Sequence, residues 1–202
     1  MLSGLSTLLW LALIVVATLA VRGVATRPLT SGRKTVSSPA TPLQTGCLAS
    51  GDGYLRMRLR HADAPDEDID WKNAEMECDG GLRPGGAGMR MVFAGPLADG
   101  HRLRIVFGAT AASDVAVSRD VPTNITVIYE DEQQVFSTAG DSKCTMDTLT
   151  LQPRDAAVTD RRMKHYLARG FCLAAATRVP DGGTLLIDRF DFLGVVFDEN
   201  EY

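Results

Sequence analysis

The sequence predicts an all-β fold: an antiparallel β-sandwich of the jelly-roll kind, preceded by an N-terminal hydrophobic helix and a flexible linker. Apolar and polar residues alternate with a period of two in several short segments after residue 54, which is typical of half-buried strands. Clusters of glycine, aspartate and proline separate these segments and indicate tight turns. The best helical candidate, residues 155–165, carries a poor apolar stripe. Many short strands between turns favour a sandwich.

The clearest strand covers residues 54–60, where Leu55, Met57 and Leu59 alternate with three arginines. One face of this strand is therefore apolar and the other basic, as in an antiparallel sheet with one buried face. The same alternation predicts further strands at residues 89–93, 102–108, 124–129, 134–138, 143–151, 167–173 and 185–197. Turns are expected at residues 79–81, 84–86, 98–100, 140–141 and 181–183.

The N-terminal segment is apolar. Residues 1–21 contain no charged side chain, and residues 8–21 are apolar apart from Thr18. Residues 1–25 are predicted to be a retained single-pass membrane anchor or a cleaved signal peptide, because the length of the apolar run fits both. The basic residues that follow favour a cytoplasmic position for the rest of the chain, which would make it a membrane adaptor facing the cytosol. The cysteines favour the opposite, extracytoplasmic position, which is the expectation here, with release to the periplasm or exterior after signal cleavage as its alternative.

Residues 26–45 are rich in serine, threonine and proline and form the predicted flexible linker, since they hold too few large apolar residues to offset the entropy of ordering. Residues 46–202 form the predicted β-sandwich domain. The charge is divided unevenly: residues 1–45 hold four basic residues and no acid, and the other 17 of the 21 basic residues and all 25 acidic residues follow. The domain is therefore acidic, which argues against a nucleic-acid partner.

All four cysteines lie in the predicted domain, and four cysteines allow three pairings. We expect the disulfides Cys47–Cys78 and Cys144–Cys172, because each closes a loop of about 30 residues and stabilises the fold by about 3–4 kcal/mol. Free buried thiols are one alternative. A zinc site is another, but it would need closely spaced pairs of cysteines, and the sequence has none.

An acidic run after the first strand supplies the candidate metal ligands Asp63, Asp66, Asp68 and Asp70. Calcium prefers six to eight oxygen ligands, which clustered carboxylates can provide. The run lacks the glycine and the final glutamate of an EF-hand loop. The alternative is a solvated loop whose carboxylates face the three arginines of the preceding strand. Calcium is the one cofactor that the sequence suggests.

A basic cluster near residue 165 supplies the candidate anion-binding residues Arg161, Arg162, Lys164 and Arg169. Guanidinium groups suit phosphate and carboxylate ligands, such as an anionic glycan or a lipid headgroup. The alternative is that these side chains solvate one face of the domain and are partly neutralised by Asp155 and Asp160.

No catalytic set is recognisable, because the three histidines stand far apart and no nucleophile elbow or metalloprotease helix is present. The sequence therefore predicts a non-catalytic binding or scaffolding domain of the cell envelope. Its expected partners are the membrane, through the N-terminal segment, and an envelope protein or glycan. The alternative is an envelope hydrolase on a jelly-roll scaffold that uses Asp188 and Asp191 with His101 or His165. The odd spacing of the two aspartates predicts opposite faces of a regular strand.

Overall fold

The computed structural model describes residues 46–62, 64–83, 88–112, 114–153 and 162–198. These residues form eleven strands and a single 3-10 turn, η1 (Asn73–Glu75), so the all-β prediction is confirmed. The predicted N-terminal helix and linker lie outside the described residues. No helix in the described part of the chain is long and apolar enough to cross a membrane. The chain divides into two units, Met1–Thr41 and Pro42–Tyr202, and everything below concerns the second.

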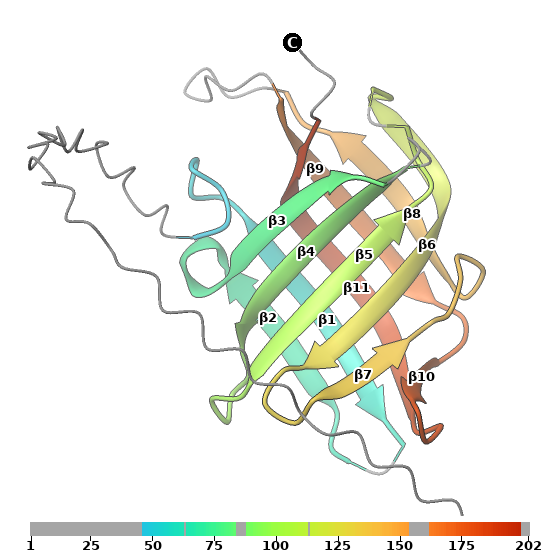
Figure 1. Cartoon of the computed structure of the whole chain (residues 1–202). Helices are drawn as coiled ribbons and strands as arrows, with labels where there is room; N and C mark the ends of the chain where they lie inside the picture. Colours follow the sequence, from blue (N-terminus) through green and yellow to red (C-terminus); the bar gives the residue numbers. More distant parts are fainter. Residues whose placement is uncertain (1–45, 63, 84–87, 113, 154–161, 199–202) are drawn as a thin grey trace, which may run out of the picture. The chain divides into compact units, whose positions relative to one another are not determined.

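The strands follow one another with short connections (Figure 1). Their bounds are β1 (Tyr54–His61), β2 (Glu67–Lys72), β3 (Glu77–Leu82), β4 (Met89–Pro96), β5 (Arg102–Ala109), β6 (Val117–Tyr129), β7 (Gln134–Ser137), β8 (Cys144–Leu151), β9 (Met163–Cys172), β10 (Ala176–Val179) and β11 (Thr184–Phe197). Strands β2, β3 and β10 were not expected from the sequence. Most of the acidic run that suggested a solvated loop belongs to β2, where Ile69 and Trp71 alternate with exposed acids and are buried.

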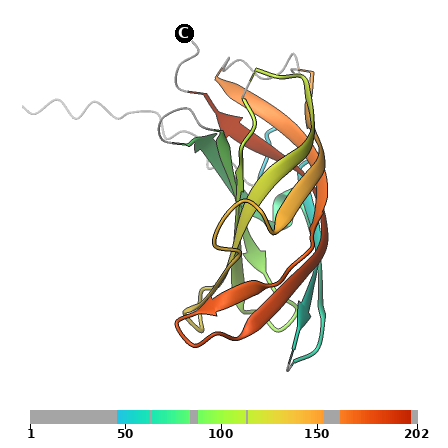
Figure 2. The same ribbon diagram turned by 90° about the vertical axis from the view of Figure 1, so that its right-hand side faces the viewer.

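Hydrogen bonds join all eleven strands into one sheet, so the two separate sheets of a sandwich are not confirmed. One wall of this sheet runs β3-β4-β5-β6-β7 and the other runs β2-β1-β11-β9-β8 (Figures 1 and 2). The long strand β6 joins them, because its first half pairs with β8 and its second half pairs with β7. All pairings are antiparallel except one short parallel contact between β3 and β11.

Aromatic side chains from both walls form the core between them. Phe93 of β4 and Phe107 of β5 lie with their ring centroids 4.9 and 4.8 Å from that of Phe192 of β11. All three are fully buried. The opposing backbone makes room with Gly194, where an added Cβ would lie 2.6 Å from Phe93 Cζ. The walls therefore pack face to face through large rings matched to a glycine.

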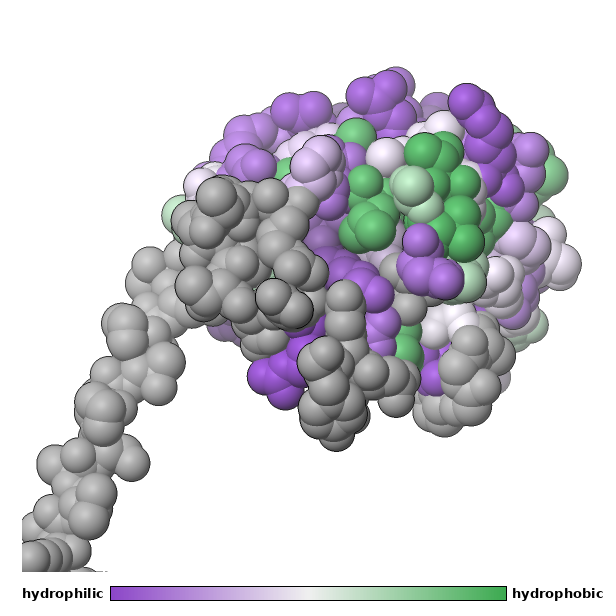
Figure 3. Space-filling view, turned by 90° about the horizontal axis from the view of Figure 1, so that it is seen from above, coloured by the Kyte–Doolittle hydropathy of each residue, from purple (hydrophilic) through white to green (hydrophobic). Residues whose placement is uncertain are grey.

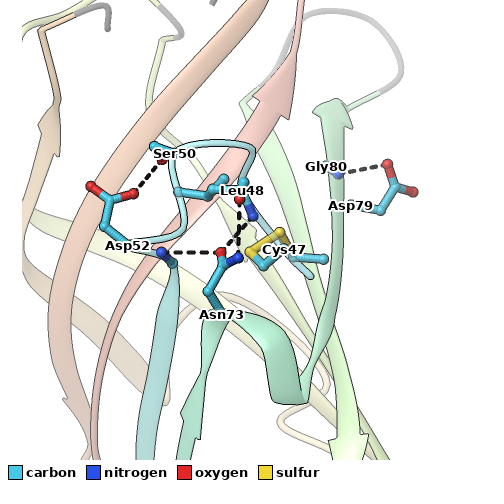
Figure 4. Close-up of a disulfide and its surroundings, with 9 residues drawn as sticks. Cys47, Leu48, Ser50, Asp52, Asn73, Asp79 and Gly80 are labelled. Atoms are coloured by element: carbon cyan, nitrogen blue, oxygen red, sulfur yellow. Dashed lines mark hydrogen bonds between the residues drawn. A yellow bond between two sulfur atoms is a disulfide. The ribbon is translucent and has the colours of Figure 1, made fainter. Parts of the chain in front are cut away.

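Two disulfides close the ends of strands, and both expected pairings are confirmed: Cys47–Cys78 and Cys144–Cys172. The first ties the segment before β1 to β3. The buried Asn73 holds the same segment, since its Oδ1 accepts from the amides of Leu48 at 2.7 Å and Gly53 at 3.2 Å (Figure 4). Its Nδ2 donates to the Leu48 carbonyl at 3.0 Å. The start of the described chain is thus pinned to the turn after β2.

Candidate functional site

The β1–β2, β6–β7 and β10–β11 connections lie at the lower end of the sheet in Figure 1. Residues from all three connections line a cleft there. We call it the end cleft, and its volume is about 300 Å³. Its polar and charged lining residues are His61, Glu67, Tyr129, Glu132, Gln134, Arg178 and Thr184. At the opposite end, a group of apolar side chains faces solvent among hydrophilic ones (Figure 3).

Three side chains of the end cleft form a hydrogen-bonded network. The Tyr129 hydroxyl donates to Glu67 Oε2 at 2.8 Å and lies 3.1 Å from His61 Nε2. His61 Nε2 also lies 3.5 Å from Glu67 Oε1. Because the tyrosine proton is directed to Glu67, His61 Nε2 carries a hydrogen and donates it to the tyrosine oxygen. This hydrogen position is assigned from the network.

The network holds Tyr129 in its neutral form. Burial raises the pKa of Tyr129 far above its usual value, and the hydrogen bond to Glu67 raises it further. The ring is 6% exposed, and its edge packs against Phe136, with ring centroids 6.0 Å apart. Tyr129 is therefore a fixed donor at the inner end of the cleft.

Strand alternation explains why these three residues meet. His61 follows the buried Leu59 by two residues, and Glu67 precedes the buried Ile69 by two. Tyr129 likewise follows the buried Val127 by two. Each polar side chain thus continues the inward-facing row of its strand to the point where the core opens to solvent. The alternation in β1 and β6 was readable in the sequence, whereas β2 was not expected and the pairing of β1 with distant strands was not readable.

The other side of the end cleft carries a cation that is already paired. Arg178 Nε donates to Asp181 Oδ1 at 2.6 Å, and its Nη1 donates to Gln134 Oε1 at 3.3 Å. The hydrogen bond from Arg178 lowers the pKa of Asp181. The guanidinium carbon lies 5.9 Å from the centroid of the Phe136 ring. Arg178 and Phe136 thus contact each other and line the same cleft as Glu67.

The candidate calcium residues meet arginines rather than one another. Asp66 and Asp68 lie 3.7 and 3.6 Å from the Nε of Arg58. Asp70 accepts from Arg56 at 3.2 Å, and hydrogen bonds from Lys72 and Arg56 lower its pKa. Asp63 lies outside the described residues. In the part of the chain that the structure describes, no group of three or more His, Cys, Asp or Glu residues is placed to hold a metal ion.

The candidate anion-binding residues are divided between the two faces of β9. Lys164 lies on the inner face and pairs with the buried Asp198 at 2.8 Å. Arg169 lies on the outer face, opposite Asp191 of β11. The backbone carbonyl of Arg162 accepts from the Asp198 amide at 2.8 Å, and Arg161 lies outside the described residues. Lys164 and Arg169 are five positions apart in β9, and an odd separation places two side chains on opposite faces of a strand.

Two of the candidate hydrolase residues, Asp188 and His101, pair with side chains outside the proposed set. Asp188 pairs with Arg60 at 2.7 Å, and His101 Nδ1 lies 3.6 Å from Asp131. His165 lies on β9 opposite Val195. The prediction that Asp188 and Asp191 point to opposite faces was wrong. A β-bulge lies where Arg58 pairs with Arg189 but Leu59 pairs with Ile187, and it places both aspartates on the outer face beside the arginines of β1.

The comparisons with known proteins add no name to this geometry. No protein-family model, curated protein or solved structure matches the chain. The end cleft therefore has to be interpreted from its own chemistry.

Proposed function

We propose that the protein is a non-catalytic binding domain that acts outside the reducing cytosol and takes a small amine-bearing ligand into the end cleft. The observation that carries the proposal is the Tyr129–Glu67–His61 network at the open end of an apolar core. A buried polar network is seldom the most stable filling of such a position, because apolar side chains would avoid its desolvation. A binding role gives a reason for its presence.

The charges of the end cleft favour a cationic ligand. Glu67 and Glu132 both line the cleft, and among the described residues Glu67 Oε1 has only the 3.5 Å contact with His61. The one arginine, Arg178, is neutralised by Asp181. A ligand ammonium group would therefore find carboxylate oxygens that can accept its hydrogen bonds. An anionic ligand would instead be repelled by the net negative charge of the cleft. A volume of about 300 Å³ suits a ligand of the size of a short diamine or a single amino sugar.

The alternative, an envelope hydrolase, is less well supported by this geometry. General acid–base catalysis needs a group that can release or take up a proton at the reacting atom. In the end cleft the Tyr129 proton is held by Glu67, and the Nε2 proton of His61 is held by the tyrosine oxygen. The network is arranged to present a fixed pattern of donors and acceptors.

The proposed compartment rests on the two disulfides, since such bridges form and persist in oxidising surroundings. We propose that residues 1–25 tether the domain to a membrane and that residues 26–45 act as its spacer. Thiol labelling of intact cells, before and after a membrane-permeant reductant, tests the compartment. Cysteines that react in the cytosol without reductant would contradict it.

Binding can be tested by thermal unfolding of the full chain in detergent with putrescine, glucose or inorganic phosphate. We expect putrescine alone to raise the midpoint, and we expect Glu67→Gln to abolish the rise because it removes the carboxylate charge. Asp99→Asn is a matched control, since Asp99 lies in the exposed turn between β4 and β5. A rise with phosphate, or an undiminished rise in E67Q, would refute the proposed ligand class.

A further inference from the structure

Among the described residues, β2 is the strand that has a single strand partner. Each of the other ten strands pairs with at least two neighbours, whereas β2 pairs with β1 alone. In an antiparallel pair every second residue directs its N–H and C=O away from the partner strand. Half of the six residues of β2 thus direct backbone groups away from β1, where the described residues supply no strand partner. The backbone amide of Lys72 donates to the side chain of Glu75 at 2.7 Å.

A groove runs along this edge, between β2 and the turn that joins β4 to β5. Its volume is about 250 Å³, and it is lined by Ile69 and Trp71 of β2 and by Leu97 of the turn. Trp71 spans the two sides, since its indole Nε1 donates to the Pro96 carbonyl at 2.7 Å. The groove therefore offers an apolar floor beside an unpaired backbone, the two features that an added strand needs.

The charged side chains that line the groove are all acidic. Asp68, Asp70 and Glu75 line it, and no basic residue does. The side chains of Asp68 and Asp70 are 69% and 59% exposed. Their arginine partners approach from β1, on the side away from the edge, and Asp70 also pairs with Lys72 of β2. The side of β2 that faces the groove thus presents negative charge to an incoming segment.

The charges along β2 also bear on pairing with a second copy of this chain. A two-fold axis pairs β2 with itself so that opposite residues share a face. Centring the axis on Ile69 puts Asp68 opposite Asp70 of the other copy, which opposes like charges and destabilises the pair. Centring it on Asp70 puts that aspartate opposite itself and Asp68 opposite Lys72, so this is the register in which a second copy would compete. The acidic residues that line the groove favour a different chain with basic residues as its occupant.

We propose that the edge of β2 binds an extended segment of a partner protein in which Lys or Arg alternates with apolar residues. The segment adds to the sheet as a further strand beside β2. Its basic side chains lie on the face of Asp68 and Asp70, and its apolar side chains enter the groove over Ile69 and Trp71. This surface is separate from the end cleft and does not depend on the proposed ligand there.

The test uses the full chain in detergent and the peptide acetyl-Lys-Val-Lys-Val-Lys-Val-amide as the probe, followed by NMR titration and amide hydrogen exchange. We expect saturable binding, with slowed exchange of β2 amides. Asp68→Asn and Asp70→Asn should each weaken binding by about fivefold, the size of an exposed ion pair. Asp188→Asn is the matched control, because Asp188 lies on the same outer face but on β11, and binding to this variant should be unchanged.

Two further peptides separate strand addition from simple charge attraction. One is N-methylated at its lysines and the other at its valines, so that each loses the donors of one edge only. We expect one of them to bind and the other to fail. Equal affinity of the two would overturn the proposal, as would equal binding of the glutamate analogue acetyl-Glu-Val-Glu-Val-Glu-Val-amide. A dimer of the unliganded chain that dissociates on Asp70→Lys would also overturn it.

Discussion

The Tyr129 hydroxyl donates a 2.8 Å hydrogen bond to Glu67 Oε2, and this bond joins the end of β6 to the start of β2. The two residues are 62 apart in sequence and come from opposite walls. The bond therefore contributes both to the chemistry of the end cleft and to the contact between the walls. Its removal should be measurable in stability as well as in binding.

Loss of stability at high pH should report on this tyrosine. The pKa of Tyr129 is raised above its usual value of about 10, so the folded state keeps a proton that the unfolded state loses. Stability is thus fully present below about pH 10 and falls as the pH rises above it. Burial raises the pKa of Tyr54 to about 12, which adds to the same loss between about pH 10 and 12.

Urea unfolding at pH 9 and pH 11 measures this effect. Tyr129→Phe should lower the free energy of unfolding at pH 9 by about 1–3 kcal/mol, because Glu67 loses its donor. It should also reduce the difference between the two pH values. Tyr54→Phe, at a more exposed position, is the comparison. An unchanged pH dependence in the Tyr129→Phe variant would show that the hydroxyl is not held neutral by the fold.

Asn73 should be among the most sensitive polar residues. Its amide makes three hydrogen bonds to the segment before β1, and it is 8% exposed. Asn73→Ala leaves buried backbone groups without partners and should lower the free energy of unfolding by about 2–4 kcal/mol. Ser50→Ala, in the same segment but exposed, should change it by less than about 0.5 kcal/mol. Equal effects of the two substitutions on the free energy of unfolding in urea would contradict the role of Asn73 in holding the segment before β1.

The contact between the walls can be tested with two glycines. A Cβ at Gly194 would lie 2.6 Å from Phe93 Cζ, whereas a Cβ at Gly108 would lie 3.8 Å from its nearest neighbour, an atom of Asn124. Gly194→Ala should therefore destabilise the fold by about 1–3 kcal/mol through overpacking. Gly108→Ala should be neutral or slightly stabilising, because alanine lowers the entropy of the unfolded chain.

A double variant checks the cause. If the ring of Phe93 is what resists the new methyl group, Phe93→Leu should cost less in the Gly194→Ala background than in the wild type, as thermal unfolding would show. Additive effects would place the strain elsewhere.

Each disulfide should contribute separately. The loops that they close have sequence separations of 31 and 28, so each should add about 3–4 kcal/mol on the chain-entropy estimate. Replacing Cys47 and Cys78 by alanine should speed amide exchange chiefly in residues 46–53, because Asn73 alone then holds that segment. Replacing Cys144 and Cys172 should act on β8 and β9. Identical exchange patterns in the two variants would contradict this division.

The features predicted correctly from the sequence are those that depend on near neighbours. Alternation at Leu55, Met57 and Leu59 is a property of the strand itself, since only one face can be buried. The disulfide pairings followed because loop closure is easier over about 30 residues than over longer stretches. The acidic run was misassigned because its exposed charges suggested a loop, while its buried partners, Ile69 and Trp71, were too few to reveal β2.

The sequence by itself determined the class of fold, the two disulfides and the residues that face inward along each long strand, because these follow from the period of two and from short-range closure. Only the tertiary structure decided which strands bring their inward-facing side chains into contact with one another. The contact of His61 with Tyr129, 68 residues away, depends on how the two walls of the sheet face each other. No local sequence pattern specifies that arrangement. The bulge at Asp188 and the unpaired edge of β2 have the same origin, since both are properties of register between strands.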